Sequence, residues 1–212
     1  MQAKALRSAV DSGLEVPPEV IKLAIDSVKQ HYCPKNGRRT VSEAEQMSQP
    51  GQFTYSKGGG GGTIAMAACG VVCLQEFGQY DDWRIPKNMA VISAAVSKLP
   101  GKSRRDGQMP FDAYTLYYVG QALYQVGGEY WKQSYPRLRD SLVASQMVDE
   151  KNPANHGTWH DRGLRGGGRV GGRPGQLYAT ATACFILAIP NRYLPILQDG
   201  KIESLKKKYG RD

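Results

Sequence analysis

Three stretches of the sequence are apolar around most of a helical circumference and rich in small residues. A helix with this pattern is expected to be packed on more than one side. Gly78 and Gly127 suit the C-terminal ends of the first two helices, and Pro190 stops the third. The pattern therefore predicts three buried helices, which span residues 63–78, 113–127 and 177–189.

Amphipathic segments lie before and between these apolar stretches. Each has an apolar stripe with helical spacing, and the segments cover residues 17–30, 86–99 and 135–146. The first begins with proline, which is tolerated in the first turn of a helix. Residues 1–9 read as the middle of one more amphipathic helix, so we expect the protein to begin further upstream. No useful length of chain alternates with period two, so strands are expected to be incidental.

The order of these elements repeats along the chain: an outer amphipathic helix, a polar glycine-rich loop, then an inner apolar helix. Gly78 and Gly127 are 49 residues apart, and Gly127 and Pro190 are 63 apart. A two-helix repeat of this length indicates an α/α toroid or solenoid. Phe53 and Trp159 each follow a glycine just ahead of an inner helix, where a ring can fill the gap between repeats.

These motifs resemble the repeats of squalene cyclases and protein prenyltransferase β subunits. The resemblance is carried by glycine and an aromatic residue before an apolar helix, by residues 114–131 and by residues 191–196, and it extends from residue 3 to residue 196. It implies an all-α fold, a terpenoid cyclase/protein prenyltransferase-like α/α toroid with an apolar central cavity. Three to four helix pairs make only a partial toroid, with the repeat domain over residues 1–198 and a basic tail over residues 199–212.

Composition narrows the class of protein. Hydrophobic residues make up 41% of the chain, which is enough for a core, and no stretch approaches the roughly 18 apolar residues of a membrane span. Without an N-terminal signal peptide, this sequence alone predicts a cytoplasmic protein, or a secreted one if a signal peptide lies upstream. The formal net charge of +9 sits largely in loops and the tail. Solvated loops are the preferred interpretation, nucleic acid is not the expected partner, and an anionic partner stays open.

The best-known catalytic motifs of the family are missing. There is no Asp-x-Asp-Asp run, and Asp81 and Asp82 are interpreted as a cap of the next helix. The Asp-x-Cys zinc motif of prenyltransferases is also missing. Neither the His31 and Cys33 pair nor the His156 and His160 pair is expected to bind zinc, and Cys69 and Cys73 are interpreted as buried small hydrophobes. No metal or cofactor is predicted, and any catalytic residues stay unknown.

Two sets of candidate binding residues remain. Aromatic faces can stabilise carbocations, so the candidates for substrate binding are tyrosines, although core packing is the preferred interpretation: Tyr114, Tyr117, Tyr118 and Tyr178. A glycine-rich turn into a helix can bind an anion, and arginines precede the third inner helix. The candidates for an anion site are Gly60, Gly61, Gly62, Thr63, Arg165 and Arg169, with a tight turn and a loop without ligand as the alternative.

Three functions follow from the sequence. The preferred one is a binding or structural repeat module without the catalytic motifs of the family, which takes an isoprenoid or another apolar ligand, self-associates or packs on further repeats. The second is an isoprenoid enzyme, of the terpene cyclase or prenyltransferase type, with its catalytic residues in N-terminal repeats outside this chain. The third is a peptide- or glycan-binding helical solenoid. Fold-level analogy does not decide among them.

Overall fold

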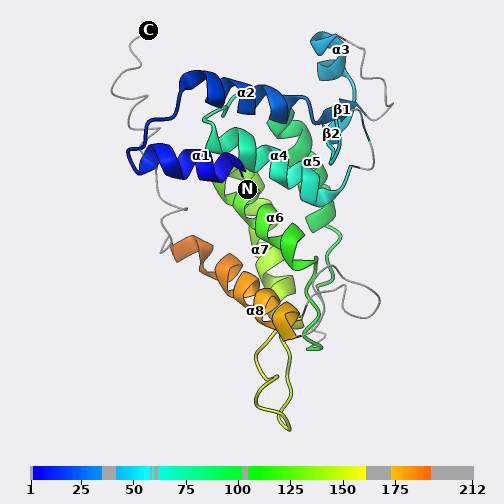
Figure 1. Ribbon diagram of the computed structural model, residues 1–212. Coiled ribbons are helices and arrows are strands. Elements are labelled where there is room, and N and C mark those ends of the chain that lie inside the picture. The colour runs from blue at the N-terminus through cyan, green and yellow to red at the C-terminus, as the bar shows by residue number, and fades with distance from the viewer. Residues whose placement is uncertain are drawn as a thin grey trace. The chain divides into compact units, whose positions relative to one another are not determined.

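The computed structural model describes residues 2–34, 42–57, 59, 62–101, 105–160 and 173–191 (Figure 1). These residues form eight α-helices, a 3₁₀-helix and one antiparallel sheet of two strands. The elements are α1 (Gln2–Asp11), α2 (Pro18–Lys29), β1 (Tyr32–Pro34), α3 (Glu43–Ser48), β2 (Gly51–Phe53), α4 (Ile64–Glu76), α5 (Arg84–Val96), α6 (Ala113–Val126), α7 (Gly128–Ser145), α8 (Arg173–Ala188) and η1 (Ile189–Asn191). The expectation of a mostly helical protein with incidental strands is confirmed for the described residues.

The described part of the chain falls into two compact units. Residues 2–91 belong to the first and residues 92–191 to the second, so the division lies inside α5. Each unit is described below by itself. The expected repeat domain over residues 1–198 stays a prediction, and the basic tail over residues 199–212 lies outside the described residues.

Helix α4 is the core of the first unit. Helices α1 and α2 and strand β2 all pack against it, and Figure 1 shows α1 and α2 beside it. The side chain of Glu76 at the end of α4 is buried and accepts a hydrogen bond from Lys4 Nζ of α1 at 2.8 Å. Arg7 of the same helix lies 3.4 Å from the other carboxylate oxygen of Glu76. An apolar helix of small residues is therefore covered by elements that precede it in the chain, α1, α2 and β2.

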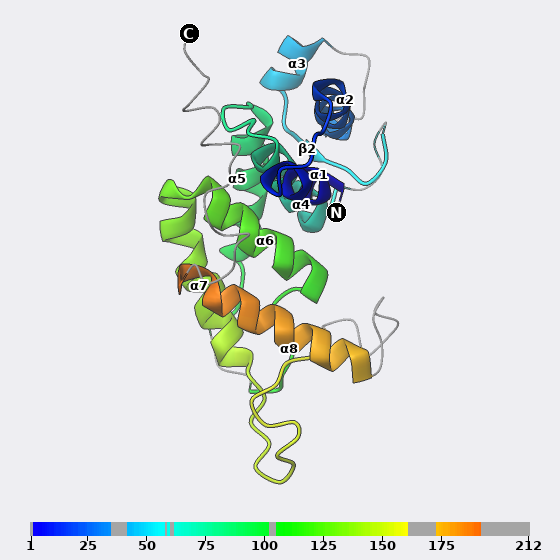
Figure 2. The same ribbon diagram turned by 60° about the vertical axis from the view of Figure 1, so that its left-hand side comes forward.

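The second unit is built on α6, which packs against both α7 and α8. Figures 1 and 2 show α6 and α8 running in the same direction, with α7 returning in the opposite one. The side-chain contacts agree with this. The ring of Tyr117 lies beside that of Phe185, and Gly120, further along α6, lies against Ile186 and Ile189, further along the chain from Phe185. Helix α7 therefore connects two helices that run in the same direction and pack on each other.

The two predicted aromatic plugs are buried. Phe53, which is 2% exposed, lies so close to Gly70 of α4 that a β-carbon there would overlap the ring. Trp159 is 3% exposed, and its indole Nε1 donates to the carbonyl of Leu142 in α7 at 2.9 Å. Its backbone N–H donates to the hydroxyl of Thr180 in α8. Each ring therefore fastens the loop that precedes an inner helix to the helices around it.

The start of one outer helix was predicted wrongly. The sequence pattern begins this helix at residue 135, next to a proline, but α7 begins at Gly128 and passes through Pro136. The ring of Trp131 stacks on that of Tyr135 with centroids 3.9 Å apart, and the Tyr135 hydroxyl donates to the carbonyl of Ile186. These contacts on the turn before Pro136 hold the chain in a helix despite the backbone N–H that proline lacks.

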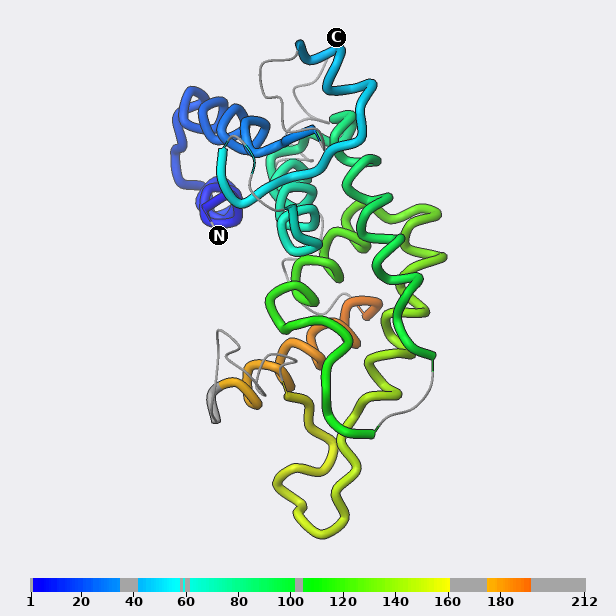
Figure 3. Tube along the Cα trace, turned by 90° about the vertical axis from the view of Figure 1, so that its right-hand side faces the viewer, coloured from blue at the N-terminus to red at the C-terminus, as the bar shows by residue number. Residues whose placement is uncertain are grey.

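A long loop leaves α7 and extends beyond the ends of α7 and α8 (Figure 3). Its two sides are joined by backbone hydrogen bonds between Met147 and Thr158 and between Gly157 and Met147. The segment before α6 adds a third strand-like partner, since Gly107 bonds to both Ser145 and His160. The sequence predicted a loop here but not this ordered pairing.

Candidate functional site

Three of the four candidate tyrosines come together on α6. The ring of Tyr118 lies between those of Tyr114 and Tyr117, with centroids 4.9 and 5.2 Å away. Phe185 of α8 continues the row, 5.2 Å from Tyr117. Tyr118, inside the row, is buried, whereas Tyr114 at one end is 43% exposed and Phe185 at the other end is half-buried. The fourth candidate, Tyr178, lies on α8 and is 37% exposed.

One side of α8 faces solvent although it is apolar. We call this side the open face, and it consists of Leu177, Tyr178, Ala181, Cys184, Phe185 and Ala188. Leu177 is 74% exposed, Ala181 and Cys184 are exposed, and Phe185 and Ala188 are half-buried. These positions recur with helical spacing along one side of the helix. No charged residue occurs between positions 174 and 191.

The buried side of α8 shows how a neighbouring inner helix is normally covered. Ala179, Ala183 and Ile186 are fully buried. A β-carbon on Gly120 of α6 would overlap the end of the Ile186 side chain, so a larger residue there would force Ile186 to move. A bulky side chain on one inner helix therefore fits against a small residue on the next. The open face has small residues of the same kind, at Ala181, Cys184 and Ala188.

The anion candidates are only partly described. Gly60, Gly61, Arg165 and Arg169 lie outside the described residues. Thr63 is the N-cap of α4, and its hydroxyl accepts a hydrogen bond from the backbone of Met66. Gly62 packs against the Gln52 side chain, whose amide donates to the Thr63 carbonyl. The described contacts of Gly62 and Thr63 are thus those of a tight turn into a capped helix.

The side chains of His31 and His160 lie at hydrogen-bonding distance from backbone carbonyls of loops. His31 Nδ1 lies 3.1 Å from the Thr54 carbonyl, and His160 Nε2 lies 2.8 Å from the Asp106 carbonyl. Among the described residues, no group of three or more histidine, cysteine, aspartate or glutamate side chains could hold a metal ion. Burial raises the pKa of the Cys73 thiol, because the thiolate would lose its hydration in the core.

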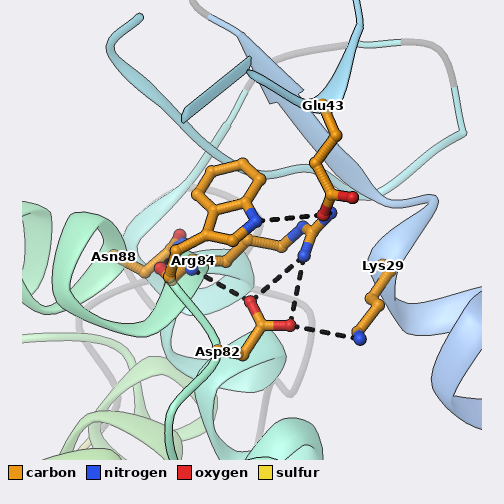
Figure 4. A network of polar contacts seen from close by, with 6 residues as sticks. Lys29, Glu43, Asp82, Arg84 and Asn88 are labelled. Atoms are coloured by element: carbon orange, nitrogen blue, oxygen red, sulfur yellow. Dashed lines mark hydrogen bonds and ion pairs between the residues drawn. The ribbon is translucent and has the colours of Figure 1, made fainter. Parts of the chain in front are cut away.

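The most connected polar cluster lies in the first unit (Figure 4). Arg84, at the start of α5, is buried, and its guanidinium donates to both carboxylate oxygens of Asp82 at 3.1 and 3.2 Å. The other terminal nitrogen donates to Glu43 of α3 at 2.9 Å, and Lys29 of α2 lies 3.4 Å from Asp82. Asp82 also accepts the backbone N–H of Arg84, which is the capping role predicted from the sequence.

This cluster also holds the Phe53 plug in place. Asn88 accepts the backbone N–H of Phe53 through its side-chain oxygen and donates its amide to the Arg84 carbonyl. The indole of Trp83 donates to Glu43 at 3.0 Å, and this hydrogen bond, followed by those from Arg84, lowers the pKa of Glu43 below 4.5. Burial raises the pKa of Tyr32 to about 12, so its hydroxyl stays neutral. The charges are paired, and the cluster ties α2, α3 and β2 to α5.

Sequence reasoning missed two groups of residues. Glu43 and Arg84 are 41 positions apart, and no local pattern indicates that they meet. Leu177 and Phe185 were counted as part of a helix apolar on all sides, with no indication that one side lies open. The available signal was the run without charge between positions 174 and 191, which leaves no side of the helix with a charged residue to face water.

None of the described helices has the length and hydropathy needed to cross a membrane. A comparison of the chain with family models, curated proteins and solved structures finds no match. The resemblance to the squalene cyclase and prenyltransferase repeats therefore rests on the residues quoted above.

Proposed function

We propose that the chain is a non-catalytic α/α-repeat module of the squalene-cyclase and prenyltransferase type, and that it docks a helical partner on the open face of α8. The observation that carries this proposal is the exposure of Leu177, Ala181 and Cys184 on a helix without a charged residue between positions 174 and 191. A helix that is apolar on all sides is stable in water only when its sides are covered.

The local geometry supports a repeat. Thr63 and Asp112 are N-caps of α4 and α6, and Gly78 and Gly127 follow these helices with φ of 67° and 66°. Both pairs are 49 residues apart. The parallel course of α6 and α8 and the plugs Phe53 and Trp159 fit the same plan. In an open arrangement of such repeats, the last inner helix has one side that the next repeat would cover.

The described chemistry supports binding rather than catalysis. The buried carboxylates of Asp82 and Glu76 are both paired with cations, and neither is placed as a proton donor. The tyrosine row on α6 is suited to packing against an apolar surface. We therefore expect no release of diphosphate when the protein is incubated with farnesyl diphosphate, with or without magnesium or zinc. Release that depends on the protein would overturn the non-catalytic part of the proposal in favour of an isoprenoid enzyme.

Extension of the chain by one repeat tests the docking face. A second copy of residues 128–191 is joined after residue 191, and its own Cys184 equivalent is replaced by serine. The added inner helix should cover α8, so the original Cys184 should react with a maleimide much more slowly than in the unextended chain. The thermal midpoint should also rise, because repeats stabilise their neighbours.

The matched control carries Ala181→Glu in the original α8. A charge on the open face should prevent the added repeat from docking, and the rate at Cys184 should return towards that of the unextended chain. Equal rates in the unextended and extended chains would contradict the proposal.

A further inference from the structure

We propose that the helical partner on the open face of α8 is a second copy of this chain, and that the two α8 helices pack antiparallel about a twofold axis. This inference rests on the proposed docking face and names its occupant. Three observations carry it: the order of large and small residues along the face, the distribution of charge, and the packing already seen between α6 and α8.

The face is complementary to itself when reversed. Its most exposed large side chains, Leu177 and Tyr178, lie at the N-terminal end of α8, whereas towards the other end the face has the half-buried Phe185 and the small Ala188. An axis between positions 182 and 183 places Leu177 of one copy opposite Ala188 of the second, and Tyr178 opposite Leu187. It also places Ala181 opposite Cys184. In an isologous interface, each such contact occurs twice.

A parallel pair lacks this fit. Each residue would then face its own copy, so that Leu177 and Tyr178 would crowd one end while Ala188 would leave a gap at the other. The dipoles of two parallel helices also repel, whereas those of an antiparallel pair attract.

Charge directs association to this face. The chain carries a formal net charge of +9, which opposes contact between copies over charged surfaces. Positions 174–191 contribute no charge, so two open faces meet without that repulsion. Helices α6 and α8 run parallel, so they set no precedent for the direction of the pair, but they show that α8 packs closely on another apolar helix, since Ile186 of α8 lies against Gly120 of α6. The small side chains of Ala181 and Cys184 leave room for the side chains of a second helix on α8.

Sedimentation equilibrium over a wide range of protein concentration gives the first test. The wild-type chain should show a reversible monomer–dimer equilibrium, and Ala181→Glu should raise its dissociation constant by about tenfold or more, because two charges would be buried at the interface. Val143→Glu is the matched control, since Val143 is 52% exposed on α7 and is not part of the face. Circular dichroism should show that both variants keep the wild-type helix content.

Crosslinking tests the direction of the helices. Leu177→Cys and Ala188→Cys are prepared separately in a Cys184→Ala background and oxidised alone and as a mixture. The antiparallel pair predicts a covalent dimer that joins the two introduced thiols in the mixture, identified by peptide mass spectrometry. Each variant alone should give little of it, because eleven helical residues separate the like positions by roughly 16 Å.

Three outcomes would overturn the inference. A chain that is monomeric at every concentration has no second copy on this face. A dimer unaffected by Ala181→Glu uses another surface, and efficient crosslinking of each variant with itself indicates parallel helices. The repeat-extension experiment separates these failures from a failure of the proposed function. If Cys184 is protected in the extended chain but the wild-type chain is monomeric, the docking face stands and only the second copy as its occupant is ruled out.

Discussion

Helices α4 and α8 have the same kind of sequence and different surroundings. Both are rich in alanine and other small residues, and both lack an extended polar side. Helix α4 is covered by α1, α2 and β2, and even its terminal Glu76 is buried in ion pairs. Helix α8 packs on α6 and α7 but leaves Leu177, Ala181 and Cys184 in solvent. An apolar sequence thus predicts that a helix packs against other elements on most of its sides. The structure shows whether those elements belong to the described chain itself.

The largest effect is expected from the same charge placed in each helix. Ala68 of α4 is fully buried, so Ala68→Glu should destabilise the fold by roughly 4 kcal/mol or more, or abolish folding. Ala181→Glu on the open face should change the free energy of unfolding by less than about 0.5 kcal/mol. Urea unfolding followed by circular dichroism, at a protein concentration low enough to exclude association, measures both. A comparable loss in the two variants would show that α8 is covered.

The next largest loss of stability is expected when an aromatic plug is removed. Phe53→Ala and Trp159→Ala should each cost about 3–5 kcal/mol, because each removes a buried ring that no neighbour can replace. Tyr55→Ala is the control, since Tyr55 is 75% exposed and two positions from Phe53. Thermal unfolding of the three variants decides the matter. If Trp159→Ala has the midpoint of the wild type, the ring does not fasten the loop to α8 as described.

Much of this fold was accessible from the sequence, because its signals are local. The small apolar residues of 63–78, the capping Asp82 and the stop at Pro190 each act within a few positions, and each was predicted. Pro136 misled because a proline at a helix start and one inside a helix look alike until the stacking of Trp131 on Tyr135 is known.

The candidate sites were less predictable because they depend on distant contacts. The Glu43–Arg84 ion pair spans 41 positions, and the open face exists only because nothing in the described chain lies over Leu177 and Ala181. A helical pattern gives the same signal whether or not a partner is present. The anion candidates Arg165 and Arg169 stay predictions.

The smallest expected effect is the contribution of Glu43, in the first unit, to the pH dependence of stability. Hydrogen bonds from Trp83, then from Arg84, lower the pKa of Glu43 below its usual 4.5. Its contribution to stability is therefore present above pH 4.5 and is lost as the pH falls through the lower pKa of the folded protein. Glu43→Gln should remove this part of the pH dependence, and the effect should be small because the carboxylate is largely exposed. Urea unfolding of the wild type and the variant at neutral and acidic pH measures it. A wild type and variant with parallel pH profiles would contradict the assigned role of Glu43.

The contrast between α4 and α8 is tested most directly by the reactivity of one cysteine in each. Cys184 is exposed on the open face, whereas Cys73 lies in α4, where burial raises the pKa of its thiol. The native protein is diluted below the dissociation constant of the proposed dimer, so that no second copy covers α8, and is treated with a maleimide; modification of each site is followed by peptide mass spectrometry. The account predicts rapid modification of Cys184, close to its rate in urea, and modification of Cys73 that is slower by about tenfold or more. Equal protection of the two cysteines would show that α8 has no open face and would contradict the account.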